Sequence, residues 1–149
     1  MRKIPYGRQW IDDDDINAVV EVLKGDWITQ GPKIEDFERA LAKYVGAKYA
    51  VAFNSGTSAL HGAMFAAGVK EGDEIITTPI TFVATSNSAL YVGAKPVFVD
   101  IDMKTYCIDA EKIEKAITGK TKAIVPVSYT HLRAHETSLH LVCRLLLEK

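Results

Sequence analysis

Short apolar runs separated by helix-length segments constrain the fold of this chain more than any other feature. The runs cover residues 49–53, 74–77, 96–99 and 123–127. Continuous apolar runs of this length are typical of strands buried on both faces. The segments between them, 57–67, 82–92 and 109–117, have the length and composition of crossover helices. Buried strands joined by crossover helices predict a three-layer α/β/α fold with a mainly parallel sheet, whose strand order stays open.

Two amphipathic helices are expected before the first apolar run. Residues 12–15 form an acidic helix start, apolar residues follow at helical spacing, and Gly25 ends the pattern. A second helix follows Pro32 and ends at Gly46. The loop between these helices, residues 26–31, is polar and aromatic.

Charge and cysteine usage exclude several classes of partner. Lysine and arginine total 18 against 19 aspartate and glutamate residues, so no basic field favours nucleic acid. Cys107 and Cys143 have neither metal-ligand spacing nor the density of a disulfide scaffold, and no apolar leader follows the N-terminus. These features indicate a cytoplasmic protein. No apolar run approaches the roughly 20 residues that cross a bilayer, so no membrane role is expected.

The turn at residues 53–60 joins an expected strand to an expected helix. Its sequence, FNSGTSAL, combines small residues with hydroxyl donors at a helix N-terminus, where negative charge is favoured. We therefore predict a phosphate site. The turn lacks the Gly-Lys-Ser/Thr ending of a nucleoside triphosphatase loop and the G-x-G-x-x-G of a dinucleotide fold. The structural alternative is that Ser55 only caps the helix while Gly56 eases a tight turn.

The order and spacing of several segments carry a family resemblance. IPYGRQWIDDDDI, DWITQGP, NSGTSAL, ITTPITFVAT and KPVFVDID follow one another between residues 4 and 102, and TKAIVPV follows at 121–127. This set resembles the DegT/DnrJ/StrS family of sugar aminotransferases, and within it the branch that aminates a sugar in pseudaminic acid biosynthesis. The resemblance implies the major domain of a fold type I enzyme dependent on pyridoxal 5'-phosphate.

The resemblance implies roles for residues of two segments in cofactor binding. Gly56, Thr57 and Ser58 match the turn that binds the cofactor phosphate, in agreement with the independent prediction from the turn. Phe82 matches the aromatic residue that stacks on the pyridine ring, a role that suits a flat apolar side chain. The alternative for Phe82 is an ordinary core phenylalanine.

A further set of residues matches the nucleotide-sugar pocket of the family. These residues are Tyr6, Asp26, Trp27, Ile28 and Thr29. Trp27 is suited to stacking on a base or sugar face, and Asp26 and Thr29 offer hydrogen bonds to hydroxyl groups. For Asp26, a plain loop role is an open alternative.

The activity that the resemblance implies is transamination of a 4-keto nucleotide sugar in a homodimer, with glutamate as the amino donor. Transamination requires a lysine that holds the cofactor and moves a proton, and no lysine in this chain matches the family's. We therefore expect an inactive N-terminal part of a longer enzyme. Alternatives are a non-catalytic regulator that binds the cofactor or the sugar, a 3-keto sugar aminotransferase, and a sugar dehydratase with the same cofactor.

Asp100 and Asp102 resemble a paired carboxylate for acid-base chemistry, but their place after a strand and before a turn favours a structural role. The sequence stops resembling the family at Ser128. We therefore divide the chain into a family part, 1–127, and a non-family tail, 128–149, which resembles a translated sequencing adapter. In that tail, His131 and His135 have the spacing of a helical metal pair, but without the glutamate of an H-E-x-x-H motif no metal site is expected.

Overall fold

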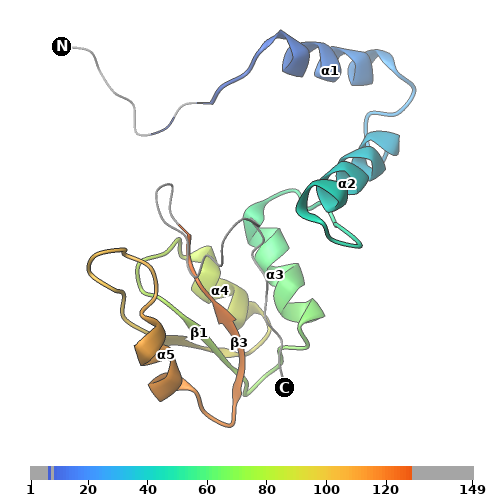
Figure 1. Cartoon of the computed structure of the whole chain (residues 1–149). Coiled ribbons are helices and arrows are strands. Elements are labelled where there is room, and N and C mark those ends of the chain that lie inside the picture. The colour runs from blue at the N-terminus through green and yellow to red at the C-terminus, as the bar shows by residue number, and fades with distance from the viewer. Residues whose placement is uncertain (1–6, 8, 129–149) are drawn as a thin grey trace, which may run out of the picture. The chain divides into compact units, whose positions relative to one another are not determined.

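The computed structural model describes residue 7 and residues 9–128 of the chain, which forms two compact units (Figure 1). The first unit extends to Val51 and the second begins at Ala52. In the part of the chain that the structure describes, no helix is long and apolar enough to span a bilayer.

The first unit contains the two helices that the sequence predicts. Helix α1 covers Asp13–Lys24, begins after the N-cap Asp12 and ends at Gly25. Helix α2 covers Pro32–Val45 and ends at Gly46, whose φ of 68° lies in the left-handed region that favours glycine. Both predicted helices and both predicted glycine ends are confirmed.

The second unit alternates helices and strands. In chain order it contains α3 (Gly56–Ala66), β1 (Glu74–Thr77), α4 (Ala84–Tyr91), β2 (Lys95–Phe98), α5 (Ala110–Ala116) and β3 (Thr121–Val125). The strands form a parallel sheet in the order β2-β1-β3, so β1 is central and the connection from β2 to β3 passes over it. The predicted parallel sheet with helical crossovers is confirmed.

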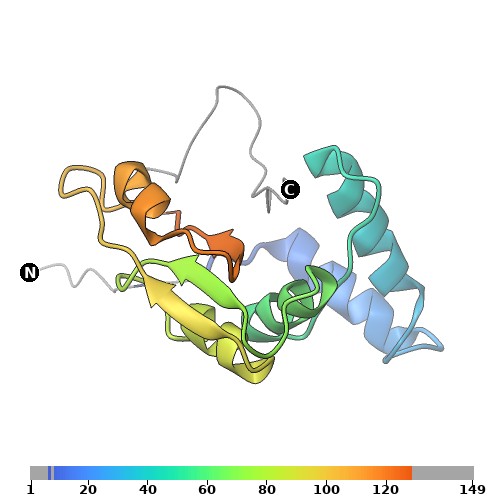
Figure 2. The ribbon, with the colours of Figure 1, turned by 90° about the horizontal axis from the view of Figure 1, so that it is seen from below.

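Two apolar clusters lie on opposite faces of this sheet. Ile75 and Ile76 are both fully buried neighbours on β1, so their side chains point to opposite faces. Ile75 belongs to the cluster that contains Met64 of α3 and Ala89 of α4. Ile76 belongs to the other cluster, against which Ile113 of α5 packs. Figure 2 shows the yellow-green α4 and the orange α5 on either side of the sheet, which confirms the three-layer arrangement.

Two details of the predicted sheet are wrong. Residues 49–53 do not form a strand, since the sheet of the described residues consists of β2, β1 and β3 and does not include this segment. Among the described strands, burial on both faces is found only in β1, where Ile75, Ile76 and Thr77 are buried and Glu74 is partly exposed. As the outer strands of the described sheet, β2 and β3 keep several side chains partly or fully exposed.

The topology brings two helix N-termini to one edge of the sheet. Helix α3 leads through a short connection into the start of β1, and α4 begins beyond the end of β1. The two helices pack against each other and lie side by side, and both run in the direction opposite to that of β1 (Figure 1). Their N-termini therefore lie toward the carboxyl ends of the strands, the edge where open α/β sheets bind ligands.

Candidate functional site

The start of α3 is capped by one side chain. Ser55 lies in an extended conformation, and its Oγ accepts a hydrogen bond from the backbone N–H of Ser58 at 3.1 Å. The Oγ atoms of Ser55 and Ser58 are 3.0 Å apart. Ser55 therefore caps the helix, but this cap accounts for only one of the amide groups in the first turn.

The remaining groups of the turn suit an anion. The backbone N–H groups of Gly56 and Thr57 make no hydrogen bond within the described part of the chain. A Cβ added at Gly56 would meet no atom within 4 Å, so the chain itself leaves space at this point of the turn. The first turn of α3 contains no acidic residue. The free amides, the hydroxyls of Thr57 and Ser58 and the positive end of the helix dipole together favour an anion at this turn, and the phosphate site itself stays a prediction.

Gly62 and Phe53 form a contact that the sequence reasoning missed. A Cβ added at Gly62 would lie 2.5 Å from Cζ of Phe53, so only glycine lets this ring lie against α3. Phe53 is the first residue of the turn, so the contact holds this end of the turn against α3. The available signal was a glycine inside a helical pattern, which often marks close packing.

Phe82 lies on the connection from β1 to α4 and is not a core residue. Its side chain is 74% exposed, which rules out the core alternative for the described chain. The carbonyl of Phe82 accepts a hydrogen bond from the N–H of Thr85 at 3.0 Å, where α4 begins. Phe82 therefore presents an open aromatic face at the sheet edge toward which α3 also points its N-terminus.

Asp26, Trp27, Ile28 and Thr29 lie on the loop between α1 and α2. All four residues are exposed, and Trp27 keeps 65% of its surface accessible. Asp26 and Trp27 line a shallow hollow together with residues at the end of α1 and the start of α2. Tyr6 lies outside the described residues. The assignment of these residues to a sugar pocket stays a prediction.

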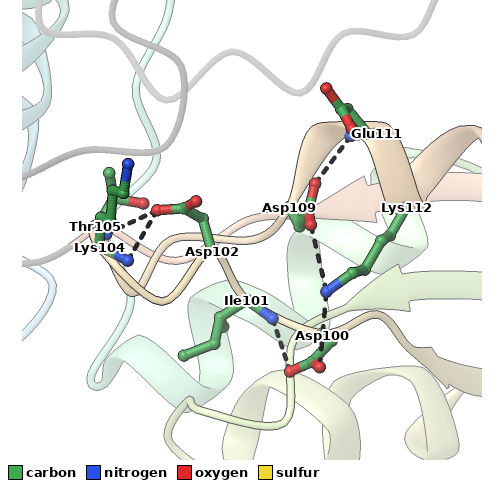
Figure 3. Close-up of polar contacts among 8 residues, drawn as sticks. All are labelled: Asp100, Ile101, Asp102, Lys104, Thr105, Asp109, Glu111 and Lys112. Carbon is green, nitrogen blue, oxygen red and sulfur yellow. Dashed lines mark hydrogen bonds and ion pairs between the residues drawn. The ribbon is translucent and has the colours of Figure 1, made fainter.

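The carboxylate of Asp102 accepts backbone hydrogen bonds within the loop that follows β2. Its Oδ1 accepts hydrogen bonds from the N–H groups of Thr105 at 2.8 Å and Lys104 at 3.0 Å (Figure 3). These bonds hold the pKa of Asp102 below its ordinary value, since they stabilise the charged form. The loop closes with Tyr106 at φ 60° and a bridge between Ile101 and Ile108.

The carboxylate of Asp100 contacts a different partner. One of its oxygens lies 3.6 Å from Nζ of Lys112, and the same ammonium lies 3.2 Å from Asp109, the N-cap of α5 (Figure 3). Asp109 and Asp100 raise the pKa of Lys112. Asp100 and Asp102 therefore do not form a pair that shares a proton, and their contacts agree with the expected structural role.

Comparison with known proteins decides the family of this chain. The family model described as the DegT/DnrJ/EryC1/StrS aminotransferase family matches residues 9–137. The chain belongs to this family. The matched range begins in the first unit and includes the α3 turn, Phe82 and the Asp102 loop.

Three relatives illustrate the likeness. The protein MJ1066 of Methanocaldococcus jannaschii is 51% identical over 126 residues, which cover 85% of this chain and 33% of the relative. A structure of the putative sugar aminotransferase Spr1654 from Streptococcus pneumoniae in its PMP form matches with TM-score 0.79 and 39% identity, over 84% of this chain and 32% of that one. The structure of Helicobacter pylori PseC, an aminotransferase of pseudaminic acid biosynthesis, matches with TM-score 0.78 and 42% identity, over 86% and 35%.

Two statements follow from these comparisons. The family's cofactor is pyridoxal phosphate, since the matched structures include PLP and PMP forms of one sugar aminotransferase. The chain spans about a third of the length of the curated relative that it matches at 33% coverage.

The family match extends to residue 137, past the predicted boundary at 127, which stays a prediction. The pair His131 and His135 lies outside the described residues.

Proposed function

We propose that the protein to which these residues belong is a pyridoxal-phosphate-dependent aminotransferase that acts on a keto nucleotide sugar. The observation that supports this most is the first turn of α3, with two unbonded backbone amides, neighbouring hydroxyls and no carboxylate. In a member of an aminotransferase family, this donor set fits the phosphate of the cofactor.

In this proposal, residues of the α3 turn bind the phosphate of the cofactor and Phe82 contacts its ring. The amides of Gly56 and Thr57 and the hydroxyls of Thr57 and Ser58 bind the phosphate and fix its distance from α3. The exposed ring of Phe82 lies on one face of the pyridine ring, orients it and excludes water from that face. Pyridoxal phosphate, when bound, supplies an electron sink for the carbon that loses or gains a proton.

The loop between α1 and α2 contributes the sugar-binding residues in this proposal. The indole of Trp27 stacks on a base or sugar face, while Asp26 and Thr29 hydrogen-bond to hydroxyl groups and Ile28 packs beside them. Tyr6 completes the set. The high exposure of Trp27 and Ile28, 65% and 67%, leaves both side chains available for a ligand.

The finer assignment follows the likeness to PseC. We place the amino group on the 4-position of a keto nucleotide sugar of the pseudaminic acid type, with glutamate as donor, in a cytoplasmic homodimer. The lysine that holds the cofactor and the acid that pairs with its pyridine nitrogen belong to residues other than these 149. We also assign 1–127 to the major domain and 128–149 to a tail foreign to the family, which sequencing of the locus from an independent library tests.

A turnover assay of the whole protein tests the reaction. Purified protein with pyridoxal phosphate, glutamate and a 4-keto nucleotide sugar is expected to yield the 4-amino sugar over many turnovers, detected by mass spectrometry. The absence of glutamate-dependent product from any keto nucleotide sugar, with the cofactor bound, would contradict the proposed reaction.

A double variant, Thr57→Ala with Ser58→Ala, tests the phosphate site. Hydroxyl donors to a charged phosphate are worth about 1.5 to 3 kcal/mol each, so the cofactor affinity falls strongly. Titration followed by absorbance measures it. The matched control is Thr118→Ala, because Thr118 lies before β3 at the opposite edge of the sheet. Unchanged affinity in the double variant would move the phosphate site elsewhere.

A further inference from the structure

The direction of the Phe82 ring depends on its backbone. The ring is 74% exposed, so few side-chain contacts hold it. The residue also precedes a helix without a conventional cap, since the N-cap of α4 is Val83 and no side chain accepts a hydrogen bond there. Some other contact must therefore fix the connection on which the ring stands.

A pair of threonines flanks Phe82 and closes the connection around it. The Oγ1 atoms of Thr81 and Thr85 are 2.9 Å apart, within hydrogen-bond distance. The backbone N–H of Thr85 donates to the carbonyl of Phe82 at 3.0 Å. Thr85 thus contacts the residue before Phe82 through its side chain and Phe82 itself through its backbone. We call this arrangement of Thr81, Phe82 and Thr85 the threonine clasp.

The helical side of the clasp is firmly fixed. Thr85 is 7% exposed, and the hydroxyl of the buried Ser88 donates to its carbonyl at 2.7 Å. Its helix packs on the sheet through Ala89, which belongs to the same apolar cluster as Ile75 of β1. Thr85 is therefore a fixed point on α4, to which its contact with Thr81 can anchor the connection between β1 and α4.

We propose that Thr85 is a positioning residue for Phe82, acting through its hydroxyl contact with Thr81. The proposal rests on the proposed function, in which the Phe82 ring stacks on the cofactor. Stacking needs the ring in one plane, and a loop with several conformers is ready to bind only for part of the time, which lowers the apparent affinity. The clasp removes those conformers before the cofactor arrives.

The test uses the whole protein and compares two substitutions at one position. Thr85→Val removes the hydroxyl and keeps the volume, whereas Thr85→Ser keeps the hydroxyl. We expect Thr85→Val to weaken pyridoxal phosphate binding about 2- to 12-fold, the range for one hydrogen bond, and to reduce the circular dichroism band of the bound cofactor. Thr85→Ser restores most of both. The matched control is Thr118→Val, which removes a hydroxyl bonded to Glu74 at the opposite edge of the sheet and leaves both readouts unchanged.

Two further variants show whether the effect passes through Phe82. Thr81→Val breaks the same contact from the loop side, so it reproduces the loss of Thr85→Val even where that buried substitution impairs folding. The double variant Thr81→Val with Thr85→Val binds the cofactor no more weakly than either single variant, because both substitutions remove the same hydrogen bond. In a Phe82→Ala background, Thr85→Val brings no additional loss of affinity.

The outcomes separate the positioning role from the proposed function. If Phe82→Ala weakens cofactor binding while Thr85→Val and Thr81→Val bind as the unmodified protein does, the clasp is irrelevant and the stacking role of Phe82 stands. If Phe82→Ala leaves binding unchanged, the stacking role fails and the positioning proposal fails with it. If Thr118→Val loses as much affinity as Thr85→Val at an equal fall in melting temperature, the effect is general destabilisation and the proposal is overturned.

Discussion

The N-termini of α1 and α3 satisfy the same requirement in opposite ways. At the start of α1, Oδ1 of Asp12 accepts hydrogen bonds from the amides of Asp14 and Asp15 at 3.1 and 3.2 Å. The side chain of Asp15 accepts one in return from the amide of Asp12 at 3.1 Å. At the start of α3, one neutral hydroxyl caps one amide, and the amides of Gly56 and Thr57 are left without a partner in the described chain.

The two helix starts differ in the charge of their first turns, and the proposed function depends on this difference. Three acidic residues in the first turn of α1 place negative charge where the helix dipole favours it, so an external anion would be repelled there. Helix α3 has no acidic residue there, and its positive end stays uncompensated. In the proposed function, the cofactor phosphate supplies at α3 the negative charge that the aspartates supply at α1.

The largest expected effect comes from giving α3 the charge of α1. Thr57→Asp places a carboxylate beside the proposed phosphate site, where two charges about 4 Å apart repel by about 4 kcal/mol at an effective dielectric constant of about 20, or about a thousandfold in affinity. The same carboxylate favours the helix itself by about 0.3 to 1 kcal/mol. Titration with pyridoxal phosphate and thermal unfolding of the whole protein measure the two opposite effects.

The matched control for this variant is Ala110→Asp. It adds the same charge to the first residue of another helix in the same unit, α5, and is expected to leave cofactor affinity unchanged. A variant Thr57→Asp that still binds the cofactor normally would show that the open N-terminus of α3 is not an anion site.

A smaller effect is expected from removing each cap. Ser55→Ala and Asp12→Ala each lose a side chain that accepts an amide hydrogen bond, and each is expected to lower the free energy of unfolding by about 0.5 to 2 kcal/mol, measured by urea titration. Only the serine variant is expected to alter cofactor affinity, because its cap orders the phosphate turn. Equal changes of affinity in both variants would contradict the functional difference between the two helix starts.

The smallest effect concerns Asp102, an aspartate that uses its charge structurally as Asp12 does. Its pKa is lower in the folded protein than the ordinary value of 3.8, so its contribution to stability is present above that value and is lost as the pH falls through the folded pKa. Asp102→Asn is expected to destabilise the protein slightly at neutral pH. The difference from the unmodified protein shrinks below pH 3.8. Thermal unfolding across this range measures it, and a difference independent of pH would show that charge is not involved.

Local sequence determined the helices and their ends. The acidic start and Gly25 bound α1, while Pro32 and Gly46 bound α2, because capping and glycine conformation depend on neighbours within a few residues. The candidate phosphate turn around Gly56 is also encoded locally, since it is one contiguous segment of the sequence. The sequence offered the Ser55 cap as an alternative to the phosphate donors; the structure shows the cap, and the phosphate site stays a prediction.

Only the tertiary structure decided what depends on partners distant in the sequence. The order β2-β1-β3 and the absence of residues 49–53 from the sheet depend on which segments pair. The sequence of an apolar run does not specify the strand with which it pairs. The exposure of Phe82 was also undecidable from sequence, because a phenylalanine in the core and one that lies exposed at a sheet edge are the same residue type. Local hydrogen bonds are encoded within a turn, whereas strand pairing and exposure are set by packing across the whole unit.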